Sequence, residues 1–193
     1  HVSLQLFGAH QVSNALAVAA AALELGVPGD VVARRLSGAT AASRWRMEVS
    51  TTAAGVTVVN DAYNANPESM EAALDALVAM STATPTRAAR RSWAVLGEMR
   101  ELGDDADAAH EAVGRAAAER GVDRVVAVGA GASGVARGAK GVGGATVVMA
   151  VADVPEAVEL VAGDVAPGDV VLVKASRAAG LERLALALTE VPA

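Results

Sequence analysis

Four polar side chains that could bind a ligand follow one apolar run of the sequence. The run at 56–59 (VTVV) is rich in β-branched residues, which is typical of a buried strand. Asp61, Tyr63, Asn64 and Asn66 come directly after this run. A carboxylate can accept hydrogen bonds from ribose hydroxyls, and an aromatic ring can stack on a base. An Asx-rich turn without any ligand accounts for the same residue types equally well.

The elements around these side chains can be predicted from periodicity. Asn66 and Pro67 are typical of the N-cap and the first residue of a helix. Apolar residues at 70, 73, 74, 77 and 78 then recur at helical spacing. The pattern is therefore a strand, a polar loop and a helix. Because ligands of open α/β sheets bind beyond the carboxyl ends of strands, we predict a ligand site in this loop, with the free helix amides facing phosphate.

Four blocks of the sequence resemble the Mur ligase family, in the order in which that family has them. The most specific is Asn-Asp-Ala-Tyr-Asn-Ala-Asn-Pro-Glu-Ser-Met at 60–70. The others are Gly-Ala-His at 8–10 followed by Asn14, Leu-Gly-Glu-Met-Arg-Glu-Leu-Gly at 96–103, and Lys-Ala-Ser-Arg continuing to Leu-Glu at 174–182. The resemblance therefore covers nearly the whole chain.

Two positions depart from the family pattern. Gln11 stands where the family usually has asparagine, and Ala175 stands where it usually has glycine. Because glycine alone adopts positive φ without strain, Ala175 puts the shape of the last loop in question.

The order of elements predicts an α/β fold. From about residue 41 onward strands alternate with helices, which favours a mostly parallel sheet with helices on both faces. The short link at 51–55 predicts that strands 46–50 and 56–60 form an antiparallel hairpin. The resemblance implies that 41–193 is the Rossmann-like C-terminal domain of a Mur ligase. It implies that 1–40 is the end of the central ATP-binding domain, with a hinge at 39–43.

The resemblance also implies an activity. It is the ATP-dependent joining of D-alanyl-D-alanine to a UDP-N-acetylmuramoyl tripeptide through an acyl phosphate, in peptidoglycan precursor synthesis. The sequence contains no Gly-x-x-x-x-Gly-Lys-Ser/Thr phosphate loop. We therefore expect a C-terminal piece of a longer enzyme, inactive alone, with the main Mg²⁺ ligands upstream and no metal ligand here. The alternatives are another Mur-type amide ligase and a non-catalytic nucleotide-binding homologue.

The resemblance implies a role for individual residues. Arg44 would support the ATP phosphates, since a planar guanidinium grips phosphate oxygens; Arg46 is less favoured because it falls within the strand alternation. Lys174 would give further cationic support to catalysis. The implied nucleotide-binding set is Asn14, Arg44, Asp61, Tyr63 and Asn66, with Asp61 on the ribose and Asn14 and Tyr63 near the base. The implied substrate-binding set is Lys174, Ser176 and Arg177.

A second motif competes with this interpretation. Gly-Ala-Gly-Ala-Ser-Gly at 129–134 follows a predicted strand, and Asp153 lies further on, as in a dinucleotide-binding fingerprint. Two or more strands precede it, however, and the helix after it is interrupted by glycines. The chain has 19 glycines, so such spacing arises easily by chance.

His110, within the helix predicted at 104–120, is expected to be a surface or cap residue without chemistry.

Composition narrows the class of protein. The formal net charge is −6, which argues against a surface that tracks nucleic-acid phosphates. There is no cysteine, so disulfides and thiolate metal sites are excluded. No apolar run approaches the roughly 20 residues of a membrane span. With no signal peptide evident, we expect a cytoplasmic protein, not inserted in a membrane and monomeric.

Overall fold

The computed structural model describes residues 1–6, 10–40, 44–82 and 90–190. The chain divides into two compact units, residues 1–43 and 44–193. The predicted boundary falls after residue 40, and positions 41–43 of the predicted hinge lie outside the described residues. No helix in the described ranges has the length and apolar character needed to cross a membrane.

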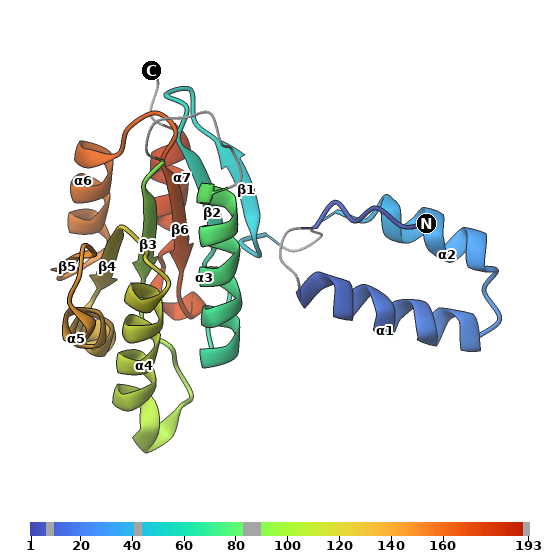
Figure 1. Ribbon diagram of the computed structural model, residues 1–193, viewed down its shortest axis with the longest axis horizontal. Coiled ribbons are helices and arrows are strands. Elements are labelled where there is room, and N and C mark those ends of the chain that lie inside the picture. The colour runs from blue at the N-terminus through green and yellow to red at the C-terminus, as the bar shows by residue number, and fades with distance from the viewer. Residues whose placement is uncertain (7–9, 41–43, 83–89, 191–193) are drawn as a thin grey trace. The chain divides into compact units, whose positions relative to one another are not determined.

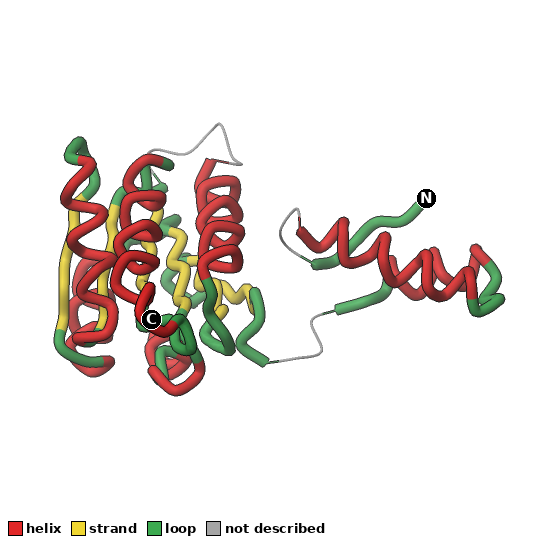
Figure 2. The backbone as a smooth tube through the Cα atoms, turned by 90° about the horizontal axis from the view of Figure 1, so that it is seen from below, coloured by secondary structure: helices red, strands yellow, loops and turns green. Residues whose placement is uncertain are grey.

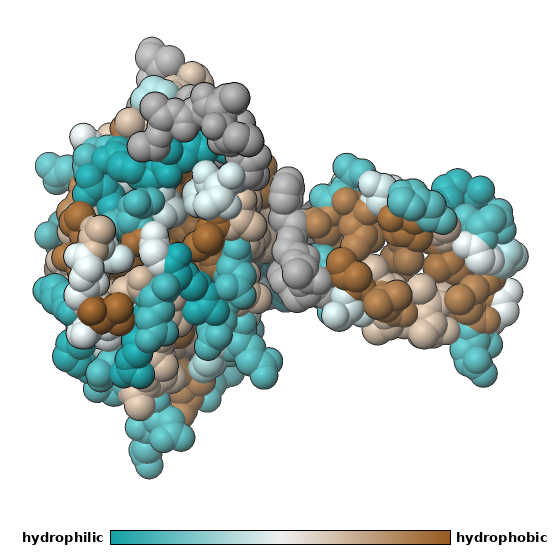
Figure 3. All heavy atoms as spheres, in the orientation of Figure 1, coloured by the Kyte–Doolittle hydropathy of each residue, from teal (hydrophilic) through white to brown (hydrophobic). Residues whose placement is uncertain are grey.

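The first unit contains two helices, α1 (His10–Glu24) and α2 (Gly29–Ser37) (Figure 1). Alanine favours α1, and Gly26, with φ of 80°, turns the chain after it. Apolar and polar residues alternate at 2–7, which predicts a short strand. This prediction is wrong for its described residues, because 2–5 have no regular structure. Apolar side chains gather on the visible face of this unit (Figure 3). Its exposed large ones include Val12, Leu16, Val18, Leu23 and Leu25.

The second unit is built on a sheet of six strands (Figure 1). These are β1 (Glu48–Thr51), β2 (Thr57–Asp61), β3 (Ser92–Leu96), β4 (Arg124–Val128), β5 (Val147–Val151) and β6 (Val170–Lys174). Their order is β1-β2-β6-β3-β4-β5, with β1 antiparallel to β2 and all other neighbours parallel. The predicted hairpin and the mostly parallel sheet are thus confirmed. The central strands β3 and β6 are buried on both faces, as continuous apolar runs require.

Helices cover both faces of this sheet (Figure 2). One apolar cluster packs α3 (Pro67–Thr82), α4 (Ala106–Glu119) and α5 (Ser133–Val142) on one face. A second packs α6 (Val154–Asp164) and α7 (Glu182–Glu190) on the other. Short 3₁₀ turns occupy 103–105, 130–132 and 177–179. The predicted fold class, a Rossmann-like sheet between two helical layers, is confirmed.

Candidate functional site

Three loops meet at one edge of the sheet, beyond the carboxyl ends of β2, β6 and β3. Lys174, the last residue of β6, is the register partner of Asp61 on one side and of Leu96 on the other. The helices after β2 and β3 lie on one face, and the helix after β6 lies on the opposite face. Such a reversal opens a crevice where α/β proteins bind ligands. The structure thus brings together three of the four sequence blocks that carry the family resemblance.

Asp61 lies at the centre of this edge, and both of its carboxylate oxygens are engaged. Oδ2 accepts a hydrogen bond of 2.6 Å from the Lys174 ammonium group. Oδ1 accepts one of 2.9 Å from the backbone amide of Met47. A carboxylate oxygen has a second lone pair, so Asp61 retains the capacity to accept hydrogen bonds from a ribose.

Lys174 is held inside the protein rather than presented to solvent. Its side chain is 2% exposed, and its ammonium group also donates a hydrogen bond of 2.9 Å to the Asn64 carbonyl. In this arrangement Lys174 braces the loop that carries Asp61. Reaching an incoming carboxylate, as the resemblance implies for Lys174, would require these bonds to rearrange.

Asn66 and Asn14 each have a local partner. The Asn66 side chain accepts a hydrogen bond of 2.8 Å from the Ser69 amide, and the Asn66 amide donates one of 3.0 Å to Ser69 Oγ. This reciprocal cap confirms the helix start predicted at Asn66 and Pro67. Asn14 belongs to the first unit, where its side-chain amide donates a hydrogen bond of 3.1 Å to Gln11.

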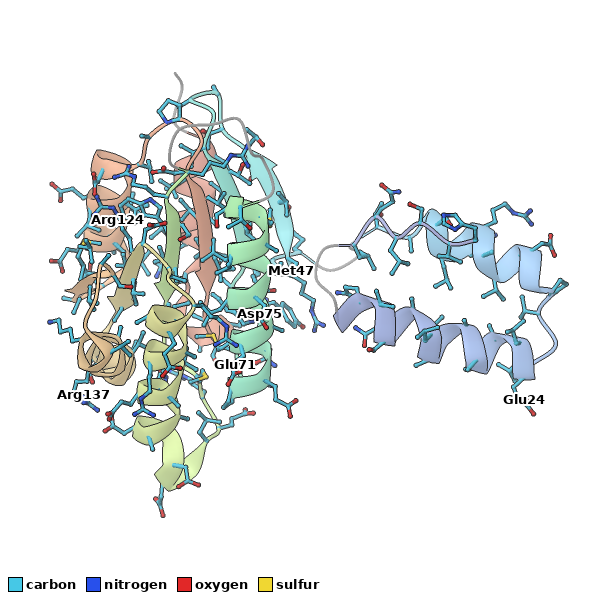
Figure 4. All side chains as sticks on the ribbon, in the orientation of Figure 1. Glu24, Met47, Glu71, Asp75, Arg124 and Arg137 are labelled. Carbon is cyan, nitrogen blue, oxygen red and sulfur yellow. The ribbon has the colours of Figure 1, made fainter. Side chains whose placement is uncertain are left out.

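The segment that leads into β1 is strained. Trp45 and Met47 have φ of 60° and 46°, in the left-handed region that bulky residues rarely adopt. The Trp45 carbonyl accepts a hydrogen bond of 3.1 Å from the Tyr63 amide, and Asp61 holds Met47. Figure 4 labels Met47 at the β1 edge of the sheet. Because of these turns, β1 begins at Glu48, two residues later than predicted.

The loops after β3 and β6 are tied to each other through Ser176. Ser176 Oγ accepts a hydrogen bond of 2.9 Å from the Arg100 amide, and the Ser176 amide donates one of 2.9 Å to the Glu98 carbonyl. Ser176 is therefore buried, whereas Arg177 is exposed. Ala175 is fully buried, and it is not among the residues with positive φ. The departure from glycine at 175 therefore introduces no backbone strain.

His110 has a structural role that the sequence did not indicate. It is 2% exposed, so the expectation of a surface residue is wrong. Its Nε2 accepts a hydrogen bond of 2.7 Å from the Met99 amide, while Nδ1 lies 2.6 Å from the Ala106 carbonyl. The neutral ring with the proton on Nδ1 satisfies both contacts. His110 thereby fixes the loop after β3 to the start of α4.

Two of the three glycines of the 129–134 motif lie close to neighbouring groups. A Cβ atom at Gly131 would lie 2.8 Å from the Glu98 carboxyl carbon, and one at Gly134 would lie 2.8 Å from His110 Cβ. The motif borders an open cleft of about 280 Å³. Its lining includes Glu98, Gly129, Gly131, Asp153, Leu181 and Arg183. Close packing against α4 therefore accounts for Gly134, and a φ of 85° accounts for Gly129, without a dinucleotide.

The described residues contain no group of three His, Asp or Glu side chains placed to hold a metal ion. The fold and the converging loops define the chain's second unit as a Rossmann-like α/β domain with its candidate site at the carboxyl edge of the sheet. Residues 45–177 match the family described as Mur ligase, glutamate ligase domain. The chain belongs to the Mur ligase family.

Similar proteins carry a more specific name. The chain is 50% identical over 201 residues to the UDP-N-acetylmuramoyl-tripeptide–D-alanyl-D-alanine ligase of Mycobacterium bovis, covering 97% of this chain and 39% of that protein. It is 31% identical over 189 residues to the ligase of the same name from Bacillus subtilis, covering 98% of this chain and 40% of that protein. The chain thus spans about two fifths of the length of these relatives.

Solved structures of MurF ligases are also similar to this chain. A MurF crystal structure from Acinetobacter baumannii matches with a TM-score of 0.81 and 31% identity, over 98% of this chain and 39% of that one. The MurF ligase of Thermotoga maritima in complex with ADP matches with a TM-score of 0.76 and 27% identity, over 98% of this chain and 40% of that one.

Proposed function

We propose that the chain is part of an ATP-dependent ligase that joins D-alanyl-D-alanine to a UDP-N-acetylmuramoyl tripeptide. Two observations support the proposal. The chain is half identical to a ligase of that name, and its Asp61 carboxylate stands at the strand edge where α/β proteins bind nucleotides. The ADP complex of a structural neighbour supports a nucleotide as one ligand.

The proposed reaction has two steps. An oxygen of the tripeptide's terminal carboxylate attacks the γ-phosphorus of ATP, so that ADP leaves and an acyl phosphate forms. The amine of D-alanyl-D-alanine then attacks the acyl carbon, losing a proton, and inorganic phosphate leaves. Phosphorylation is needed because a carboxylate oxygen is otherwise a poor leaving group. Both steps develop charge on phosphate oxygens, which cationic side chains stabilise.

The proposed roles combine the family resemblance with the contacts of Asp61 and Lys174. Asp61 accepts hydrogen bonds from the ribose, and Lys174 holds Asp61 and the Asn64 carbonyl in position for this. Arg44 contacts the phosphates. Ser176 and Arg177 serve the incoming substrate from the loop after β6. Tyr63 is proposed for the base, and Asn66, at the start of α3, for the nucleotide. Asn14 belongs to the first unit and is proposed for the base on the family resemblance alone.

Mg²⁺ would neutralise part of the phosphate charge in such a reaction. Its ligands would lie in parts of the ligase outside the described residues of this chain. The sequence also contains no phosphate loop. We therefore propose that the 193-residue chain alone does not form the amide bond.

The test is phosphate release by the complete ligase that carries this chain. ATP, Mg²⁺, the UDP-linked tripeptide and D-alanyl-D-alanine are supplied together and then with each omitted in turn. We expect phosphate release only when both the UDP-linked tripeptide and D-alanyl-D-alanine are present. Asp61→Ala should lower kcat/KM by about a hundredfold or more, mainly through a higher KM for ATP. Asp104→Asn, at an exposed acid of the turn before α4, is the matched control and should leave the kinetics unchanged.

Three outcomes contradict the proposal or a part of it. Phosphate release that does not depend on D-alanyl-D-alanine would indicate a Mur-type ligase with a different amine substrate. The absence of turnover by the complete protein would indicate a non-catalytic homologue. Ligation by the 193-residue chain alone would show that the phosphate-binding machinery is already present in it.

A further inference from the structure

Three arginines and two aromatic rings form one alternating stack in the second unit. The guanidinium carbon of Arg44 lies 5.5 Å from the centre of the Trp45 ring, and that of Arg177 lies 5.6 Å from the same ring. Arg177 also lies 5.7 Å from the Tyr63 ring, and Arg46 lies 4.3 Å from it. These distances are within the roughly 6 Å over which a ring attracts a cation. The order is Arg44, Trp45, Arg177, Tyr63, Arg46, and we call this set the arginine stack.

The arginine stack gathers positive charge without an ion-paired carboxylate in the described part of the chain. Among the described residues, none of its three guanidinium groups forms an ion pair. The two nearest acids along the chain are engaged elsewhere, since Asp61 pairs with Lys174 and Glu48 accepts a hydrogen bond of 3.1 Å from the Trp45 amide. All three arginines are exposed, on a chain whose net charge is −6. A bound anion would relieve the repulsion between them.

The backbone fixes the rings that carry these cations. Trp45 has positive φ, and its carbonyl is bonded to the Tyr63 amide, so the two rings belong to one hydrogen-bonded unit. Strained residues of this kind persist where the surrounding structure holds them, and they cluster at ligand sites. The Trp45 indole Nε1 is buried and has no hydrogen-bond acceptor among the described residues.

We propose that the arginine stack binds a chain of linked phosphate groups, with Arg46 and Arg177 acting beside Arg44. Each planar guanidinium can grip two phosphate oxygens. Three guanidinium groups have more hydrogen-bond donors than the two oxygens of one carboxylate can accept. Linked phosphate groups offer several charged oxygens in a row. Tyr63 then serves as a platform for Arg46 and Arg177.

The inference rests on the proposed function for the identity of the phosphate carrier. That reaction offers two candidates, the triphosphate of ATP and the diphosphate of the UDP-linked substrate. Both present the same chemistry to the arginine stack. Binding is therefore tested first with inorganic tripolyphosphate, and then separately with ATP and with UDP.

The experiment is calorimetric titration of the 193-residue chain at low ionic strength. We expect saturable binding of tripolyphosphate, weakened about tenfold or more by Arg177→Gln, since a charge-assisted contact in the middle of the arginine stack is lost. Arg46→Lys should weaken binding severalfold. The positive charge remains, but the planar guanidinium group that lies over Tyr63 and can bind two phosphate oxygens is lost. Arg115→Gln removes an exposed arginine on α4 and should leave the affinity unchanged. Unchanged melting temperatures would establish that each variant is folded.

Each outcome of the titrations either supports or overturns the inference. Tighter binding of ATP than of UDP supports the inference with the nucleotide as carrier, and the reverse supports it with the UDP-linked substrate. Absence of saturable tripolyphosphate binding overturns the inference. So does an equal loss in Arg177→Gln and Arg115→Gln, which would mean that only overall charge matters. Phosphate release by the complete ligase is a separate readout, so failure of the proposed function would be recognised independently.

Discussion

The Lys174 ammonium group and the Asp61 carboxylate form an ion pair of 2.6 Å between register partners of β6 and β2. Lys174 is 2% exposed and Asp61 is 13% exposed, so the pair is largely shielded from water. Removing one partner of a buried pair leaves the other charge uncompensated, which costs more than the intact pair contributes. The pair therefore governs both the stability of the site and its geometry.

Lys174→Met should destabilise the fold by about 3 kcal/mol, because Asp61 would lose its counter-charge in a poorly solvated place. Urea unfolding of the 193-residue chain measures this. Lys140 is the only other lysine in the sequence and lies exposed near the end of α5. Lys140→Met should change stability by less than about 0.5 kcal/mol. A similar small effect at both positions would mean that the pair contributes little.

Local patterns predicted the elements better than they predicted the contacts within the site. The helix start at Asn66 and Pro67 is encoded by neighbouring residues, and it was predicted correctly. Alternation of strands and helices likewise sufficed for the fold class. The Lys174–Asp61 pair joins residues 113 positions apart, so no local pattern reveals it. The left-handed Trp45 was missed for a related reason, since a hydrogen bond from distant Tyr63 stabilises it against its own preference.

A second polar cluster lies at the opposite edge of the sheet, around Asp169. Its carboxylate accepts hydrogen bonds of 2.7 Å from Arg91, 3.0 Å from the Trp93 indole and 3.0 Å from the Ala166 amide. Burial alone would raise the pKa of Asp169, but the bonds from Arg91, Ala166 and Trp93 outweigh it and hold the pKa below its usual value. A carboxyl whose pKa is lower in the folded state stabilises the fold when ionised.

The stabilisation by Asp169 should therefore be fully present above the unfolded-state pKa of about 3.9 and should be lost as the pH falls through the lower folded-state pKa. Asp169→Asn should lower the unfolding free energy at neutral pH by about 2–3 kcal/mol, since Arg91 loses its partner. It should also flatten the decline of stability below about pH 4. Chemical unfolding at a series of pH values measures both effects. Asp104→Asn should retain the pH dependence of the wild type; a parallel decline in Asp169→Asn would contradict the assignment.

Two glycines of α5 offer a matched test of helix packing. A Cβ atom at Gly138 would lie 1.8 Å from the Glu111 carbonyl oxygen of α4, whereas nothing lies within 4 Å of one at Gly141. Gly138→Ala should therefore force the two helices apart and cost about 2 kcal/mol or more. Gly141→Ala should be neutral or stabilise by up to about 1 kcal/mol, because alanine favours a helix. Thermal unfolding of the two variants gives opposite signs if the backbones of α4 and α5 pack as closely as described.

The last prediction concerns Ala175, in the loop after β6. A Cβ atom at Gly97 would lie 2.8 Å from Ala175 Cβ, so the two loops leave room for only one methyl group. Gly97→Ala should cost about 1–3 kcal/mol in the wild type. In an Ala175→Gly background the same change should cost at least about 1 kcal/mol less, because the methyl group that it meets is gone. Combining Ala175→Gly with Gly141→Ala is the control, and these distant changes should add. Additive costs at 97 and 175 in a double-mutant cycle would show that the two loops do not meet through these methyl positions.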